Sequence, residues 1–298
     1  MQKGYSLHVG LDYVNPDYYD GNWTGKLFCC VNDAKAMLQL AKQQGFEKTK
    51  LLTNEKAIRK NIVNTLKKYA RDLVKGDLLF ISYSGHGGSV LDLNGDEDDG
   101  YDETFCLYDG DFLDDEMHEA FALFKKDVRI LFVADCCHSG TVVKNGREDV
   151  TYNSLEKELE KRGYRPRTRP KAIGRVIRKK RKDFFEQFRN RKIVDLSNIG
   201  ANVLQLGACQ DNQKAYEGDD YGMFTGRLLN CWDDGNLDSN YDELHKEILL
   251  CMPRLQNPTL YLTGSANKNF LNQKPFSIQI EKTNSYVPKI YKFLSQYF

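Results

Sequence analysis

The chain has 298 residues, of which 41% are hydrophobic and 29% charged, with 17 Tyr and 16 Phe. This composition excludes a disordered or collagen-like chain, and the length is ample for one large or two ordinary domains with a full core. No apolar run reaches the roughly 18 residues of a membrane span, and the first residues contain no apolar signal segment. We therefore expect a cytoplasmic protein without a membrane span.

Charge is distributed unevenly along the chain. The net charge is only +1, but residues 161–192 contain 15 basic and 2 acidic side chains. This segment has a net charge of +13, and the remainder has a net charge of −12. The sequence therefore predicts an acidic body interrupted by one basic segment.

Short β-rich runs alternate with amphipathic patterns in the first half of the chain. We expect strands at 5–14, 50–52, 77–83 and 128–134. Apolar residues at helical spacing predict helices at 33–44, 58–73 and 114–124. This alternation is typical of an α/β fold, with a mostly parallel sheet covered by helices on both faces.

The alternation breaks from about 145 to 195 and then resumes. Beyond the break we expect strands at 202–208 and 259–263 and helices at 223–232 and 241–252. Short helices at 155–162 and 184–191 would cover one edge of the sheet. The expected organisation is a first half over 1–145, a basic linker over 146–195, and a second half with its tail over 196–298.

The cysteines form no C-x-x-C pair, and two adjacent pairs in a chain without a signal peptide do not resemble a disulfide framework. Free thiols in a reducing compartment are expected. The cysteines are Cys29, Cys30, Cys106, Cys136, Cys137, Cys209, Cys231 and Cys251.

Two of the buried strands are followed by reactive side chains. His86 follows the strand at 77–83, and Cys137 follows the strand at 128–134. The carboxyl ends of parallel strands share one edge of a sheet, so these side chains should meet there. A thiol beside an imidazole is a strong nucleophile, and the backbone amides of Gly87 and Cys137 could hold an oxyanion. On these two residues alone, an inert thiol and a structural histidine would be the ordinary interpretation.

The surrounding motifs change that interpretation. They are CVNDA (30–34), YSGHGG (83–88), DEDDGYDE (96–103), DDE (114–116), DCCHSG (135–140) and GACQDNQ (207–213). In order and spacing this set resembles the metacaspases, which are caspase-like cysteine peptidases. The resemblance covers roughly 5–144 and 196–270, and it implies a caspase-like fold. The chain begins almost at the first strand, so no N-terminal prodomain is expected.

The resemblance also implies roles for individual residues. Cys137 matches the nucleophile and His86 the general base. The matching residues of the pocket for the residue before the scissile bond (the S1 pocket) are Asp33, Asp135, Cys30 and Ser84. Their two carboxylates suit a guanidinium or ammonium group. The implied reaction is hydrolysis of proteins and peptides after Arg or Lys through a thioester, with no cofactor required for the chemistry.

Two of these roles have alternatives. Cys136 is a rival nucleophile, but strand alternation points it away from Cys137, and the family motif places the nucleophile directly before His-Ser-Gly. Asp33 could instead cap a helix that begins at Ala34, a role compatible with lining the pocket.

Calcium activation is a further property that the resemblance suggests. Many metacaspases bind Ca²⁺ through acidic residues that correspond to Asp98, Asp99, Asp114 and Asp115, and through an Asp seven residues after the nucleophile. Here that last position is Lys144. We therefore expect calcium dependence to be weak or absent.

The basic segment has three open interpretations. It could be a solvated insertion without a function. It could be a processing region, cut by this enzyme or by an activating protease to convert a zymogen. It could be a polyanion-binding patch, although nucleic-acid binding is not favoured. The basic residues of the processing region are Lys161, Arg162, Arg165, Arg167, Arg169, Lys171, Arg178, Lys179, Lys180 and Arg181.

A protein of another class would share the same fold. A caspase-fold adaptor or effector would be silent in isolation and would bind a regulatory partner or nucleic acid through the basic segment. The paired Cys137 and His86 argue against a permanent loss of catalysis. A paracaspase-like peptidase is a nearer alternative, and the Cys-His-Ser-Gly run weighs against it.

Overall fold

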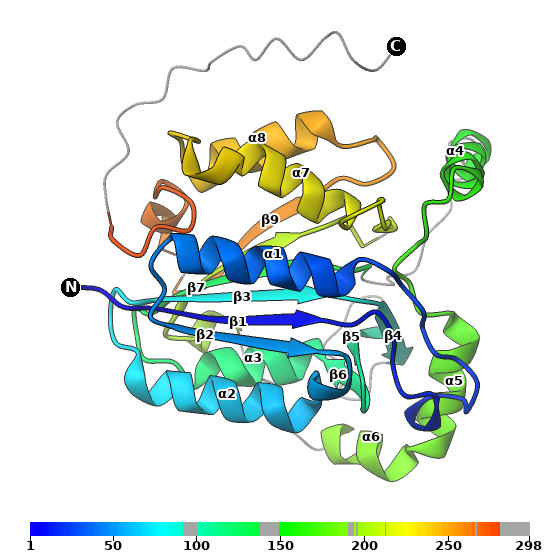
Figure 1. Cartoon of the computed structure of the whole chain (residues 1–298). Helices are drawn as coiled ribbons and strands as arrows, with labels where there is room; N and C mark the ends of the chain where they lie inside the picture. The colour runs from blue at the N-terminus through cyan, green and yellow to red at the C-terminus, as the bar shows by residue number, and fades with distance from the viewer. Residues whose placement is uncertain are drawn as a thin grey trace, which may run out of the picture.

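Six strands form the central sheet in the order β2-β1-β3-β7-β8-β9 (Figure 1). All neighbouring pairs are parallel except β8 and β9, which are antiparallel. The mostly parallel α/β sheet expected from the sequence is therefore confirmed. The strands are β1 (Gly4–Gly10), β2 (Lys48–Thr53), β3 (Leu78–Ser84), β7 (Arg129–Asp135), β8 (Asn202–Gly207) and β9 (Thr259–Gly264).

The structure is a computed structural model that describes residues 1–91, 101–137, 149–189, 194, 196–211, 213–265 and 267–280. Within these residues, no helix combines the length and the apolar character needed to cross a membrane. Short 3₁₀ helices lie at Pro16–Tyr18, Asn54–Lys56, Leu196–Asn198, Asp233–Gly235 and Lys268–Phe270.

Helices cover both faces of the central sheet (Figure 1). One face carries α1 (Cys30–Gln43), α7 (Met223–Trp232) and α8 (Tyr241–Cys251). The other carries α2 (Arg59–Asp72) and α3 (Asp114–Ala122). These helices lie where the apolar spacing predicts them, because each one buries its apolar stripe against the sheet.

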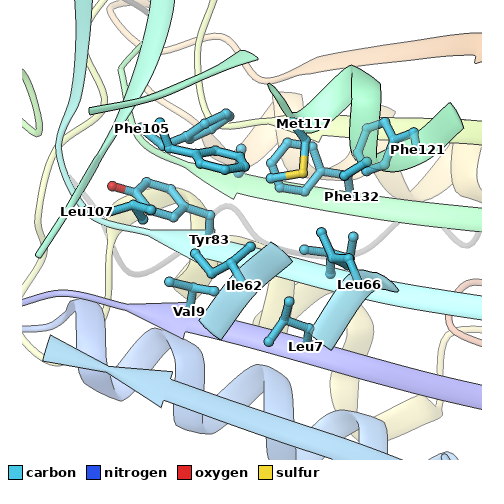
Figure 2. Packing of buried hydrophobic residues seen from close by; sticks show 14 of the residues in the cluster. Leu7, Val9, Ile62, Leu66, Tyr83, Phe105, Leu107, Met117, Phe121 and Phe132 are labelled. Atoms are coloured by element: carbon cyan, nitrogen blue, oxygen red, sulfur yellow. The ribbon is translucent and has the colours of Figure 1, made fainter. Parts of the chain in front are cut away.

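The core consists of two clusters, one on each face of the sheet. Figure 2 shows the cluster under α2 and α3, where Ile62 and Leu66 lie over Leu7 and Val9 of β1. Burial of such side chains stabilises the fold by about 1.5–3 kcal/mol each.

A second, antiparallel sheet follows β3 and was not expected from the sequence. It contains β4 (Gly87–Leu91), β5 (Tyr101–Leu107) and β6 (Gly110–Leu113). The glycines that open β4 have low strand propensity, so local pattern gives no sign of it. Tertiary pairing with β5 decides its conformation instead.

The basic linker is largely helical, with α4 (Asp149–Lys161), α5 (Lys171–Lys180) and α6 (Lys182–Arg189). Two of these helices were anticipated only in part, and α5 was missed. Ile177 of α5 and Phe185 of α6 are buried in the core cluster under α2 and α3. In Figure 1, α5 and α6 lie beyond the carboxyl ends of the strands, whereas α4 projects away from them. This part of the linker therefore belongs to the folded body.

Candidate active site

The carboxyl edge of the central sheet brings the two expected reactive residues together in register. Ser84, the last residue of β3, is paired with Asp135, the last residue of β7. His86 and Cys137 each follow these paired residues by two positions. Both side chains are buried at this edge, with exposed fractions of 8% and 1%.

The adjacent cysteines face opposite sides of the sheet, as strand alternation predicts. Cys136 packs in the core cluster beneath α2 and α3, whereas Cys137 belongs to the cluster on the other face. The amide of Ala215 donates a hydrogen bond of 3.0 Å to the Cys137 sulfur. Cys137 is therefore the thiol held beside the second half of the chain.

His86 is buried beside an aromatic ring. Its ring centroid is 5.1 Å from that of Trp23, and its Nδ1 atom makes no hydrogen bond with the described residues. Burial, with a further contribution from the Arg167 guanidinium, lowers the pKa of His86 to about 3, although backbone groups of Gly25 and Arg167 oppose the shift. The imidazole is therefore neutral near pH 7.

An arginine of the basic linker fills the pocket between the two carboxylates. The Arg167 side chain is fully buried, and its guanidinium is 2.7 Å from Asp33 and 2.9 Å from Asp135. It also donates to the Ser84 hydroxyl at 3.0 Å and to the Cys29 sulfur at 3.1 Å. The predicted acidic pocket thus has an arginine from its own chain as its occupant.

The two carboxylates are held in place by groups from several elements. Asp33 accepts hydrogen bonds from the Ser84 hydroxyl at 2.6 Å and from the Gly222 amide at 2.8 Å. The amide and hydroxyl of Thr225 donate to Asp135 at 3.0 and 2.7 Å. Burial raises the pKa of Asp33 to about 6, although the guanidinium beside it acts in the opposite direction.

One sequence expectation about this pocket needs correction. The helix containing Asp33 begins at Cys30 and not at Ala34, so Asp33 does not cap it. The Cys30 thiol is buried near Ser84 and the Arg167 guanidinium, and the neighbouring Cys29 sulfur accepts a hydrogen bond from that guanidinium.

The backbone around Arg167 is held as firmly as its side chain. The carbonyl oxygen of Arg167 accepts hydrogen bonds from the amides of Gly87 at 3.0 Å and Cys137 at 3.5 Å. The Arg167 amide donates to the carbonyl of Ala215 at 2.8 Å. The two amides expected to hold an oxyanion therefore converge on one peptide carbonyl.

The residues that flank Arg167 are bound as an added strand. The carbonyl of Arg165 accepts a hydrogen bond from the Glu217 amide at 2.8 Å. Pro166 pairs antiparallel with Tyr216, and Thr168 pairs parallel with Gly87. Strand addition of this kind is a common way of binding an extended peptide. The site can therefore hold a peptide with an arginine side chain in an acidic pocket and the arginine carbonyl between two amides.

Several residues of the site come from the second half of the chain and were missed by sequence reasoning. Most act through the backbone, for which residue type gives no signal; they are Ala215, Tyr216, Glu217, Gly222 and Thr225. The run RPRTRP at 165–170 contains one signal that Arg167 is the arginine bound in the pocket. Of its three arginines, only Arg167 is not followed by proline.

The suggested calcium ligands are only partly described. Asp114 and Asp115 open α3, whereas Asp98, Asp99 and Lys144 lie outside the described residues. Across the described residues, no three His, Cys, Asp or Glu side chains are grouped so as to hold a metal ion.

Comparisons with known proteins place this site in context. Residues 6–145 match the family model "Metacaspase, peptidase C14 domain". Metacaspase-1 of Schizosaccharomyces pombe is 29% identical over 265 residues, which is 76% of this chain and 58% of that protein. Metacaspase-1A of Aspergillus niger is 35% identical over 155 residues, 47% of this chain and 37% of that protein. The chain therefore spans less than two thirds of either relative.

Two solved structures have related folds. Protein GSU0716 from Geobacter sulfurreducens is 37% identical, with a TM-score of 0.82 over 93% of this chain and 99% of that one. Caspase-1 from Spodoptera frugiperda is 10% identical, with a TM-score of 0.50 over 89% of this chain and 88% of that one. The second likeness concerns the fold alone and confirms the expected caspase-like architecture.

Proposed function

Since the chain belongs to the metacaspase family of caspase-like cysteine peptidases, we propose that it is an endopeptidase that cleaves after Arg or Lys. We propose further that it is a zymogen whose first substrate is its own Arg167–Thr168 bond. One observation carries this proposal: the Arg167 guanidinium lies between Asp33 and Asp135 while the Arg167 carbonyl accepts from the amides of Gly87 and Cys137.

The chemistry follows from this arrangement. The Cys137 sulfur attacks the Arg167 carbonyl carbon, and the thiol proton passes to the neutral imidazole of His86. The two amides stabilise the negative charge that develops on the carbonyl oxygen. The bond to the Thr168 nitrogen then breaks, and His86 protonates the leaving amine. Water hydrolyses the resulting thioester to the Arg167 carboxylate and the free thiol.

The neighbouring arginines are poorer candidates for the cut. Cleavage after Arg165 or Arg169 would have to break a bond to the nitrogen of Pro166 or Pro170. A proline nitrogen carries no N–H, and its ring fixes the local backbone, so it fits less well as a leaving group in a strand-like site. The prolines therefore favour the bond after Arg167.

The same contacts make the uncut protein inactive toward other substrates. As long as the strand at 165–168 is bound, its arginine and its carbonyl fill the positions that a substrate needs. Cleavage converts this strand from part of a closed chain into a free end that can leave the site. The basic linker thus supports the processing interpretation, and the burial of Arg167 removes it from any polyanion-binding surface.

Incubation of the purified protein tests self-cleavage directly. We expect two fragments whose intact masses and N-terminal sequence identify Thr168 as the new first residue. Arg167→Gln should abolish this cut, because glutamine supplies no cation to the two carboxylates. Arg162→Gln, which removes an exposed linker arginine, is the matched control and should be cut normally. Absence of any cut under activating conditions would favour a non-catalytic effector.

Self-cleavage after Arg167 is expected to decline as pH falls through about 6. The raised pKa of Asp33 beside Arg167 means that its ionised form, which pairs with this arginine, is present above this pH and is lost below it. The measurement is the rate at which the Thr168 end appears, as a function of pH, for wild type and Asp33→Asn. The variant should be slow at every pH but should lack this decline; an equal decline in both proteins would contradict the assignment.

Self-cleavage is expected to proceed at the same rate in EGTA as in calcium. Lys144 lies at the position where the family supplies a carboxylate, and an ammonium group cannot ligate Ca²⁺. Time courses under the two conditions check this expectation. Strict restoration of activity by calcium would show it to be wrong.

A further inference from the structure

A second linker arginine, two residues past the proposed scissile bond, is as deeply buried as the first. The Arg169 guanidinium lies 3.1 Å from the carboxylate of Asp111 in β6, and neither side chain is exposed. It also donates to the carbonyl of Ser89 at 2.9 Å. The Arg169 amide donates to the carbonyl of Gly87 at 2.8 Å. Side chain and backbone are therefore both held by the small antiparallel sheet.

Two glycines provide the space for this side chain. A Cβ atom at Gly88 would lie 2.4 Å from the Arg169 Nε atom, and one at Gly174 of α5 would lie 3.2 Å from its Nη1 atom. A side chain at position 88 would thus displace the guanidinium. The arginine occupies a fitted pocket and not a chance surface contact.

We propose that Asp111 and Arg169 form a clamp that positions the Arg167–Thr168 bond for self-cleavage. This inference rests on the proposed function and deepens it. Asp33 and Asp135 hold the chain on one side of the bond, and Asp111 holds it on the other, with a single residue, Thr168, between the bond and the clamp. A peptide fixed on both sides has little freedom to move its carbonyl away from the attacking sulfur.

The clamp acts within the chain because the segment after it stays in place. Pro170 follows Arg169 directly and precedes the first residue of α5. Ile177 in that helix and Phe185 in α6 are both buried in the core. The downstream side of the cut therefore remains docked, so Asp111 serves as a positioning residue for the protein's own bond.

The clamp is tested by Arg169→Gln, with Arg175→Gln, which removes an exposed arginine of α5, as its matched control. We expect Arg169→Gln to slow the appearance of the Thr168 end by about 30-fold or more, the loss seen when one partner of a buried charged pair is removed. A larger share of cuts should fall at other bonds. Arg169→Lys should recover part of the rate, and Arg175→Gln should match wild type.

A double-mutant cycle separates the clamp from a general loss of stability. Asp111→Asn combined with Arg169→Gln should be no slower than the slower single variant, since each change removes the same interaction. Thermal unfolding of the same variants in an uncut Cys137→Ala background measures any change in stability. Fully additive rate losses, or wild-type self-cleavage of Arg169→Gln at the same bond, would overturn the clamp.

A second readout does not depend on cleavage. In a His86→Ala background, we expect Arg169→Gln to increase the rate at which iodoacetamide alkylates Cys137, because the strand covering it is held less tightly. If the wild-type protein proved unable to cut itself, the proposed function would fail. A faster alkylation of Cys137 in the Arg169→Gln variant would still show that Arg169 holds the strand over this thiol. An unchanged alkylation rate would count against the clamp itself.

Discussion

Cys137→Ala is expected to abolish both self-cleavage and peptide hydrolysis, with a rate loss of at least about 10⁴-fold, because removal of a catalytic nucleophile takes away the covalent route. The uncut protein should accumulate at full length. Intact mass measured over time, together with a fluorogenic peptide carrying arginine before the scissile bond, checks this. Peptides with lysine or aspartate at the same position test the specificity in the same assay.

Cys136→Ala is the matched control, since it removes the neighbouring thiol from the opposite face of the sheet. We expect it to keep its activity and to lose no more than about 1–2 kcal/mol of stability, as for a small change in a packed core. The reverse outcome, an active Cys137→Ala and an inactive Cys136→Ala, would transfer the role of nucleophile to Cys136.

Asp135→Asn is expected to lower kcat/KM for arginine peptides by about 10³-fold. The change leaves the guanidinium buried without one of its two carboxylates, a loss of the size measured for one partner of a desolvated charged pair. KM and kcat for an arginine peptide, measured on protein already cut at its linker, provide the test.

Asp234→Asn is the control for this variant. Asp234 is exposed and adopts a left-handed backbone conformation that asparagine accepts readily. It should behave as wild type. Equal kcat/KM values for Asp135→Asn and wild type would show that Asp135 does not recognise the basic residue.

Much of the fold was predictable because local pattern and tertiary structure agree there. The strands β3 and β7 are fully buried and rich in apolar residues, and the motifs lie at and just after their ends, so the placement of His86 and Cys137 at one edge of the sheet follows from sheet topology. The helices α1 and α2 have apolar stripes that only burial against a sheet explains.

The small antiparallel sheet, helix α5 and the bound Arg167 depend on tertiary contacts that no local sequence pattern encodes. The sheet containing β4 begins with two glycines, one of which leaves room for Arg169. Helix α5 has only Gly174 and Ile177 fully buried, so its basic surface hides its place in the core. The burial of Arg167 needs Asp33, Asp135 and the backbone of Ala215, which are far apart in the sequence.

A cut after Arg167 does not separate this arginine from the nucleophile Cys137. These residues are separated by 29 others in the chain, and a cut after Arg167 leaves that connection intact. The new carboxyl end stays covalently tethered to the nucleophile, so its return to the pocket is an intramolecular event. The first cut would then leave an enzyme that its own product inhibits by competition. A second cut upstream of Arg165 would release the inhibitor, so the degree of activation would depend on how many linker bonds are broken.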